Sequence, residues 1–271
     1  MLNETLQQKY EALQSAVTAL GSVAVAFSGG VDSTLLLKVA HDQLGSSCVA
    51  VTGKSPSVPA REIREARAFC ETEGIRHVVV ETHEYDIPGF DHNPENRCYL
   101  CKKELFTQVS EAASTLGVAA IAEGSNMDDL ADYRPGFKAV EEMRVASPLR
   151  EAGLFKQDIR DISRELGLPT WNKPSFACLN TRFAYGDLIT SDRLAMVDAA
   201  EQLLLDLGFR TVRVRLRDET ARIEVAPEDI ARLAVPATRK QVVPAFKNLG
   251  FTYVSVDLEG YRSGSMNATL G

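Results

Sequence analysis

The segment Ser28–Ser33, which reads SGGVDS, constrains the fold of this chain more than any other. The apolar run before it, residues 23–27, predicts a buried strand, and the apolar run after it, residues 34–40, predicts a buried helix. A strand that enters a helix through glycines can bind an anion, because the free amides of the first helical turn point at the ligand and the helix dipole favours negative charge. The chain is therefore expected to bind phosphate at this turn.

Each residue type in the loop suits that role. Gly29 and Gly30 let the backbone approach phosphate oxygens, while Ser28 and Ser33 can add hydroxyl donors. The carboxylate of Asp32 would repel phosphate, so we expect it to hold Mg²⁺ or to cap the helix. The loop lacks the lysine of a Walker motif. The alternative is an ordinary strand-to-helix turn with two glycines.

Composition limits the classes of protein and partner. The chain has 271 residues and a net charge of −7, which argues against a dominant nucleic-acid-binding surface. Its apolar runs are too short to cross a membrane, and residues 1–6 do not resemble a secretory signal. Five cysteines without an export signal indicate a reducing compartment instead of disulfides. We therefore expect a cytoplasmic protein with no membrane and no nucleic-acid partner.

The first part of the chain alternates between strands and helices. Such alternation predicts an α/β domain with a doubly wound, mostly parallel sheet, here over residues 1–150. Ligands of such sheets lie outside the carboxyl ends of the strands. The Ser28 loop and the segments after Glu81 and Glu123 should therefore share one rim. The expected elements are helices over 2–20 and 59–74 and strands over 23–27, 48–52, 77–81 and 118–122.

The character of the sequence changes near residues 147–153, and residues 151–271 predict a second, smaller α/β domain. A loop rich in Pro, Asn, Ser and Thr spans residues 167–189. Ser191 is a plausible cap of the helix that follows. The expected elements are helices over 155–166, 191–207 and 240–249, a short helix from Pro227, a hairpin over 211–217 and 221–225, and a strand over 251–258.

The five cysteines fall into two groups. Cys98 and Cys101 form a Cys-x-x-Cys pair at a helix start, where two thiolates converge within one turn, and Cys178 is the third candidate ligand. Cys48 and Cys70 have apolar neighbours and are expected in the core.

Three candidate ligands leave the nature of the site open. A structural zinc site normally has four ligands, and His92 could be the fourth. Three cysteines also suit a 4Fe-4S cluster in which one iron stays open for chemistry. A free thiol pair without metal is the third possibility.

The segment after the fourth strand, residues 123–136, holds four carboxylates and one arginine. This exceeds what a turn requires, so the segment is a candidate for nucleotide or metal contact, with Ser125 and Arg134 as ATP-binding candidates. A solvated acidic loop is the alternative.

The predicted hairpin strand 212–217 alternates strictly between apolar residues and arginine. Arg213, Arg215 and Arg217 therefore share one face, and planar guanidiniums in a row suit a phosphate or a carboxylate. The alternative is the solvent face of an edge strand, where charges also block aggregation.

Taken together, these motifs resemble those of a known protein family. The Ser28 loop resembles that of the PP-loop ATP pyrophosphatases, whose domain is HUP-like and Rossmann-like and which cleave ATP between the α and β phosphates. The whole set resembles the LarE family over nearly the full length of the chain. The matching segments are residues 28–33, 123–139, 147–149, 171–173, 177–186 and 260–267.

The resemblance implies an ATP-dependent sulfur insertase in the synthesis of the nickel-pincer nucleotide cofactor. Its substrate would be pyridinium-3,5-biscarboxylic acid mononucleotide, a carboxylate of which ATP adenylates before sulfur converts it to a thiocarboxylate. One kind of member sacrifices the sulfur of a single cysteine, which matches Cys178. The other kind carries three cysteines and a 4Fe-4S cluster, with a sulfide at the open iron. Cys98, Cys101 and Cys178 match the second kind.

The resemblance also implies roles by position. Lys102 would be an active-site lysine near the phosphates, and Glu201 and Glu224 would belong to a metal site in the second domain. A third carboxylate of that metal site does not align, because residues 230–232 read Ile-Ala-Arg. The family further implies a homo-oligomer, a hexamer. The implied substrate-phosphate site consists of Thr181, Arg182, Arg213 and Arg215.

Three other functions compete with this one. A PP-loop tRNA thiolase can also use three cysteines and a cluster, but it needs an electropositive RNA surface or an added RNA domain. A glutamine-dependent amidating ligase needs a glutaminase half. A non-catalytic nucleotide-binding or metal-binding protein would not need the intact Ser28 loop together with Lys102.

Overall fold

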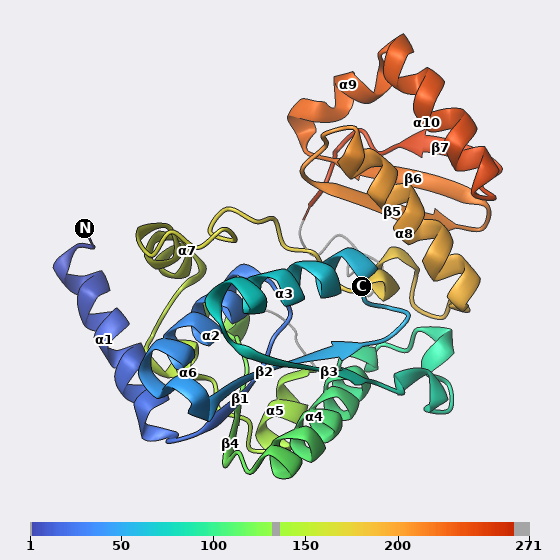
Figure 1. Cartoon of the computed structure of the whole chain (residues 1–271). Coiled ribbons are helices and arrows are strands. Elements are labelled where there is room, and N and C mark those ends of the chain that lie inside the picture. Colours follow the sequence, from blue (N-terminus) through green and yellow to red (C-terminus); the bar gives the residue numbers. More distant parts are fainter. Residues whose placement is uncertain (1, 132–135, 263–271) are drawn as a thin grey trace. The chain divides into compact units, whose positions relative to one another are not determined.

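The computed structural model of the chain describes residues 2–131 and 136–262 (Figure 1). The chain divides into two compact units, which are considered separately below. The first unit is Met1–Ile87 with Asn96–Phe176, and the second is Pro88–Glu95 with Ala177–Gly271.

The first unit is built on a four-stranded parallel sheet in the order β3-β2-β1-β4, which confirms the predicted fold class. Its central strand pairs on both sides, so that Val25 lies beside Ala50 and Ala122. Because helices also cover both faces of this strand, its sequence is apolar without interruption. The strands are β1 (Val23–Ala26), β2 (Cys48–Lys54), β3 (Arg76–Glu81) and β4 (Ala120–Ala122).

Helices cover both faces of this sheet (Figure 1). Val23 and Val25 point into a core formed with α1, α2, α3, α6 and α7, whereas Ala24 faces α4 on the other side. A further small cluster joins α4 to α5. The helices are α1 (Glu4–Ala19), α2 (Val31–Leu44), α3 (Ala60–Glu73), α4 (Arg97–Leu116), α5 (Gly136–Glu142), α6 (Pro148–Glu151) and α7 (Lys156–Glu165).

The strand order reverses at β1. The chain leaves β1 through α2 towards β2 and β3, and it returns to the opposite side of β1 as β4. Open α/β sheets bind ligands at such a reversal, because the loops that leave the two neighbouring strands diverge there. The crevice is therefore expected between the residues that follow β1 and those that follow β4.

The boundary between the two units lies later in the chain than the predicted residue 150. The first unit continues to Phe176, because α7 buries Ile159 and Ile162 against the core that contains α1 and α2. Residues 88–95 lie within the first half of the sequence but belong to the second unit. There the backbone amides of Gly186 and Ile189 donate to the carbonyls of Asn93 and Asp91.

The second unit is a three-stranded sheet in the order β5-β6-β7, with β5 and β6 antiparallel and β6 and β7 parallel. Its elements confirm the predicted hairpin and last strand. They are α8 (Ser191–Asp206), β5 (Val212–Arg217), β6 (Thr220–Val225), α9 (Ile230–Ala234), α10 (Pro236–Asn248) and β7 (Tyr253–Val256).

Two details of helix starts differ from expectation. The N-cap of α8 is Thr190, whose side chain accepts from the amide of Arg193, so Ser191 is not the cap. Helix α10 begins at Pro236, four residues before the predicted start, because a proline suits the first helical position.

Short 3₁₀ helices make up the remaining regular structure. They are η1 (Gly45–Ser47), η2 (Glu84–Asp86), η3 (Phe90–His92), η4 (Met127–Ala131), η5 (Leu179–Arg182) and η6 (Pro227–Asp229). In the described ranges, a helix both long and apolar enough to span a membrane does not occur.

Replacement of Ile162 by alanine tests whether α7 belongs to the first unit. The side chain is fully buried, so its truncation should destabilise this unit by about 2–5 kcal/mol. Trp171 is the single tryptophan of the chain and lies in the first unit, so its fluorescence during urea unfolding reports the change. The control is Gln157→Ala, a position on the same helix outside the core. A shift no larger than that of the control would contradict the assignment.

Candidate active site

The Ser28–Ser33 loop has the geometry of an anion site. Gly29 has a φ of 69°, a left-handed conformation that favours glycine, and Gly30 is the N-cap of α2. The N-cap forms no side-chain hydrogen bond. The hydroxyls of Ser28 and Ser33 lie 3.0 Å apart, and the Ser33 hydroxyl also accepts from the Ser28 amide at 3.3 Å. The loop is thus fixed by its own hydroxyls. Because Asp32 lies inside the helix and Gly30 is the cap, a capping role for Asp32 is wrong.

The segment that leaves β4 passes very close to the start of α2. A Cβ atom added to Gly124 would lie 3.0 Å from the amide nitrogen of Ser33 and 3.3 Å from the carbonyl carbon of Asp32. A larger residue could not occupy this position without moving backbone. Gly124 therefore lets the two backbone segments meet at the reversal of strand order.

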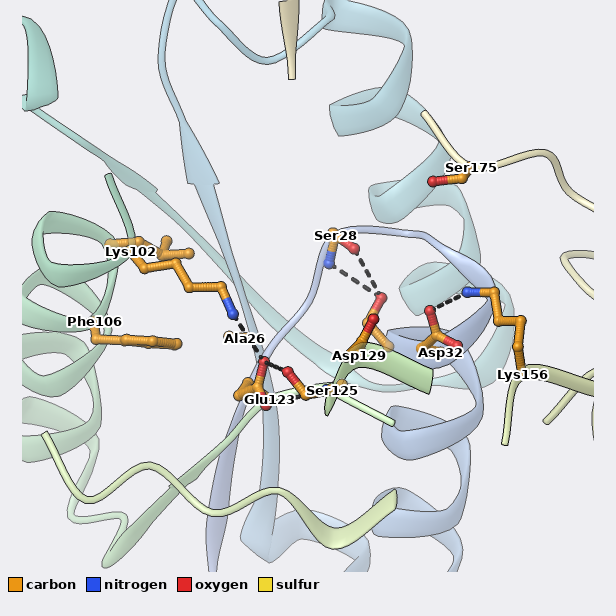
Figure 2. Close-up of a pocket in the computed structure, with 13 residues that line it drawn as sticks. Ala26, Ser28, Asp32, Lys102, Phe106, Glu123, Ser125, Asp129, Lys156 and Ser175 are labelled. Carbon is orange, nitrogen blue, oxygen red and sulfur yellow. Dashed lines mark hydrogen bonds and ion pairs between the residues drawn. The ribbon is translucent and has the colours of Figure 1, made fainter. Parts of the chain in front are cut away.

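A pocket opens at this meeting point (Figure 2). Its cavity of about 280 Å³ lies near the lower limit for small-molecule sites, about 300 Å³. Five of the predicted site residues line it. They are Ser28, Asp32, Ser33, Lys102 and Ser125, and the other lining residues are Ala26, Leu105, Phe106, Glu123, Gly124, Asp129, Lys156 and Ser175.

On one side of the pocket, a buried carboxylate holds Lys102. The Lys102 Nζ lies 3.3 Å from Glu123 Oε2, and the hydroxyls of Ser125 and Ser147 donate to Glu123 at 2.7 and 2.9 Å. Burial raises the pKa of Glu123, but the charge of Lys102 and the two hydroxyl donors outweigh it, so the pKa lies below its usual value. Glu123 therefore stays ionised and keeps the ammonium of Lys102 at the pocket.

On the other side, Asp32 accepts from the side chains of Lys156 and Asn126. The backbone amide of Asn126 in turn donates to Asp129 at 3.0 Å. Asp32 and Asp129 both line the pocket, and carboxylate and amide oxygens are the ligands that Mg²⁺ prefers. Asp32 and Asp129 are the carboxylates on this side of the pocket that could hold a magnesium ion together with the phosphates of a nucleotide.

Lys173 also fixes the Ser28–Ser33 loop, through a hydrogen bond to its backbone. Lys173 donates to the Gly29 carbonyl at 3.0 Å and pairs with Glu62 and Glu65 at 2.8 and 2.7 Å. Residues 171–173 are among the segments that carry the family resemblance, so the sequence contains a signal for Lys173. For Lys156 it contains none, because Lys156 is an ordinary lysine at the start of an amphipathic helix.

The five cysteines differ in burial, and the two that were expected in the core are buried. Cys48 and Cys70 are buried, and burial raises the pKa of each thiol to about 12, so they are core residues. Cys98 is exposed and Cys101 is partly exposed, both in the first turns of α4. Cys178 is also partly exposed, but it belongs to the second unit.

The metal site of three cysteines therefore stays a prediction. Within the described residues, no group of three His, Cys, Asp or Glu side chains gathers in a way that could hold a metal ion. His92, the other candidate ligand, lies in the second unit, where its Nδ1 is 2.9 Å from Asp91. Arg134 lies outside the described residues.

In the second unit, the four residues predicted to bind a substrate phosphate come together. Arg182 donates to the Thr181 hydroxyl at 2.7 Å, and Arg215 donates to the Thr181 carbonyl at 2.6 Å. Arg213 lies on the same face of β5 as Arg215, and its pKa is lowered to about 10 by burial and by the charge of Arg182. Two of these guanidiniums, those of Arg182 and Arg215, pair with the buried carboxylates of Glu201 and Glu224.

These arginines do not form the solvent face of an edge strand. β5 is an edge strand, but Arg213 and Arg215 are only 2% and 4% exposed. The interpretation as an exposed charged face is therefore wrong for these two, because the packing of the second unit covers them.

The two glutamates with a predicted metal role pair with arginines instead. Glu201 takes two hydrogen bonds from Arg182, at 2.7 and 2.9 Å, and Glu224 takes two from Arg215, at 3.0 and 2.9 Å. Burial raises the pKa of Glu201, but Arg182 outweighs it and the pKa is lowered. The pairs give no support to a metal at Glu201 and Glu224, whose metal role stays a prediction.

The fold and the site together define a PP-loop ATP pyrophosphatase: a doubly wound parallel sheet with an SGGxDS turn at its switch point. No protein-family model matches the chain. Among curated proteins, an uncharacterized protein of Synechocystis sp. is 45% identical over 98% of this chain and 99% of its own length. The pyridinium-3,5-bisthiocarboxylic acid mononucleotide synthase of Lactiplantibacillus plantarum is 41% identical over 98% of this chain and 96% of its own length.

A more distant relative matches only part of the chain. A glutamine-hydrolyzing GMP synthase component from Thermoplasma volcanium is 25% identical over 57% of this chain and 54% of its own length. The high identity over almost the full length of the Lactiplantibacillus synthase shows the family. The chain belongs to the LarE family and is an ATP-using enzyme of the PP-loop superfamily.

Replacement of Glu123 by glutamine tests the carboxylate that holds Lys102. The lowered pKa means that the ionised carboxylate contributes stability above the ordinary value of 4.5, and this contribution is lost as pH falls through the lowered pKa. At pH 7 the variant should be less stable by about 1–3 kcal/mol, and the difference should shrink below the ordinary value. Urea unfolding at several pH values measures it.

The matched control is Glu142→Gln, which removes an exposed carboxylate that pairs with Lys138. It should change stability by less than about 1 kcal/mol. A difference between wild type and Glu123→Gln that did not depend on pH would contradict the ionised state of Glu123.

Proposed function

We propose that this chain is an ATP-dependent sulfur transferase of nickel-pincer nucleotide synthesis. It adenylates a carboxylate of pyridinium-3,5-biscarboxylic acid mononucleotide, releases pyrophosphate and converts the carboxylate to a thiocarboxylate. The observation that carries the proposal is the pocket at the strand reversal, where the Ser28 loop, Asp32 and Lys102 meet. The bisthiocarboxylic acid mononucleotide in the name of the 41% identical synthase supports the substrate and product.

The residues of the pocket suit adenylation. The amides at the start of α2 and the hydroxyls of Ser28 and Ser33 can hold phosphate oxygens, and the loop is already fixed before ligand binds. Lys102 adds a positive charge close to the leaving pyrophosphate, while Glu123 fixes its position. ATP binding needs a cation beside Asp32, and Mg²⁺ supplies charge neutralisation of the phosphates when bound.

The buried arginine cluster of the second unit suits the phosphate of the nucleotide substrate. Arg182 and Arg215 are held in place by Glu201 and Glu224, so their guanidinium planes are fixed in direction before substrate arrives. Fixed planar donors recognise phosphate with little loss of side-chain entropy. This arrangement suits a small nucleotide substrate.

The proposal also concerns the source of the transferred sulfur. Cys98 and Cys101 are accessible on one helical turn, unlike the core thiols of Cys48 and Cys70, so they fit a role as ligands. The family resemblance implies that Cys98, Cys101 and Cys178 would hold a 4Fe-4S cluster, which would supply a sulfide bound at its open iron. The alternative is sacrifice of the Cys178 sulfur. By family resemblance the enzyme is a homo-oligomer, a hexamer.

The first test concerns adenylation. Asp32→Asn should keep the fold but lower ATP-dependent pyrophosphate release roughly a hundredfold or more, because the variant lacks charge beside the phosphates. The assay measures pyrophosphate released with ATP, Mg²⁺ and the nucleotide substrate. Asp42→Asn, on the same helix but paired with Lys38, is the control and should behave like wild type. Normal release by Asp32→Asn would contradict the assignment of this site.

The second test separates the two sulfur sources. Cys98→Ala, Cys101→Ala and Cys178→Ala should each lose iron binding and sulfur transfer, yet each should still release pyrophosphate, because adenylation needs only the ATP site. Iron and sulfide analysis under anaerobic conditions and the intact mass after turnover measure this. Cys70→Ala, a core position, should keep its iron.

The sacrificial mechanism gives a different result. Dehydroalanine at position 178 after turnover, or full activity of Cys98→Ala, would overturn the cluster in favour of sacrifice of Cys178.

A further inference from the structure

Two lysines reach the pocket from opposite sides of the Ser28 loop (Figure 2). Lys102 comes from α4 and pairs with Glu123, and the family resemblance already gives it a role. Lys156 comes from the first turn of α7 and pairs with Asp32. Neither the sequence motifs nor the family resemblance assigns a role to Lys156.

We propose that Lys156 is a phosphate ligand of the ATP site. When ATP binds, the Lys156 ammonium leaves the Asp32 carboxylate and contacts an oxygen of the pyrophosphate half of ATP. This inference rests on the proposed function, because it names a further binding residue of the same site. Three observations carry it: the charge of the pocket, the anchoring of Lys156, and the other partners of Asp32.

The charge of the pocket favours the exchange. Its described lining contains two lysines, Lys102 and Lys156, and three carboxylates, Asp32, Glu123 and Asp129. A bound polyphosphate adds several negative charges to this already acidic surface. The ammonium groups at the pocket are therefore attracted more strongly to the phosphates than to single carboxylates. Lys102 pairs with a buried carboxylate, Glu123, whereas the partner of Lys156, Asp32, is partly exposed, so Lys156 is the lysine that we expect to exchange its partner.

The anchoring of Lys156 allows such a movement. Its backbone amide donates to Asp128 Oδ2 at 2.6 Å, and the amide of the preceding Phe155 donates to Asp158 at 3.0 Å. The start of α7 is therefore fixed by contacts that do not involve the ammonium. The side chain is 34% exposed, and a lysine has a flexible stem with three donors at its end. Nζ can thus swing while the backbone stays in place.

Asp32 can release Lys156 without being left in an unfavourable state. Its other carboxylate oxygen accepts from the Asn126 side chain at 3.3 Å. Its position in the first turn of α2 places the carboxylate at the positive end of the helix dipole, which stabilises negative charge. The carboxylate that Lys156 leaves is then available to a cation that accompanies ATP.

The test is the binding of inorganic pyrophosphate, measured by calorimetry in metal-free buffer. Four forms of the full chain are compared: wild type, Lys156→Met, Asp32→Asn and the double variant. If Lys156 contacts phosphate directly, Lys156→Met should lower the affinity for pyrophosphate roughly tenfold or more, both in wild type and in Asp32→Asn. Lys156→Arg should retain most of the affinity, and Lys38→Met, which removes an ammonium from α2 that pairs with Asp42, should bind like wild type.

A purely neutralising role for Lys156 predicts a different pattern. Lys156→Met would then weaken binding in wild type but have no effect in Asp32→Asn, where no charge is left to neutralise. That result, or wild-type affinity in Lys156→Met, would overturn the inference. Circular dichroism confirms that each variant folds. Release of pyrophosphate from ATP by wild type is measured in parallel, and its absence would contradict the proposed function instead.

Discussion

The pocket of the first unit depends on the close approach of two backbone segments at the strand reversal. The turn after β1 needs a left-handed residue at Gly29, and the segment after β4 needs a residue without a side chain at Gly124. Together they leave the start of α2 open towards a pocket instead of covering it. Every charged residue named here reaches this opening from a different element: Asp32 from α2, Lys102 from α4, Asp129 from η4 and Lys156 from α7.

Buried carboxylates hold cations in place in both units. Glu123 holds Lys102 in the first unit, and Glu201 and Glu224 hold Arg182 and Arg215 in the second. Burial of such pairs costs desolvation energy, which a folded protein without ligand must offset elsewhere. A ligand that brings negative charge then meets cations whose orientation is already set, and little side-chain entropy is lost on binding.

Much of this could be predicted from the sequence, because the signals are local. Apolar runs predicted the parallel strands, and the SGGVDS turn predicted a ligand site at the rim of the sheet where the pocket lies, while the role of Lys102 came from the family resemblance. Three features could not be predicted. Lys156 has no sequence signature, and the position of α7 depends on tertiary packing of Ile159 and Ile162. The burial of Arg213 and Arg215 also depends on neighbours distant in sequence, since an alternating strand predicts faces but not what covers them.

The path of the chain between the two units has a consequence for the order in which contacts form during synthesis. Residues 88–95 are made early, yet the rest of the second unit begins only at Ala177. The side-chain amide of Asn93 donates to the carbonyls of Phe183 and Ala184, so these hydrogen bonds cannot form until those residues have left the ribosome. The parallel pairing of β1 with β4 likewise waits for about a hundred residues, and non-local pairing of this kind is slow. Residues 88–95, between β3 and α4, therefore form their final hydrogen bonds only after the whole first unit has been synthesised.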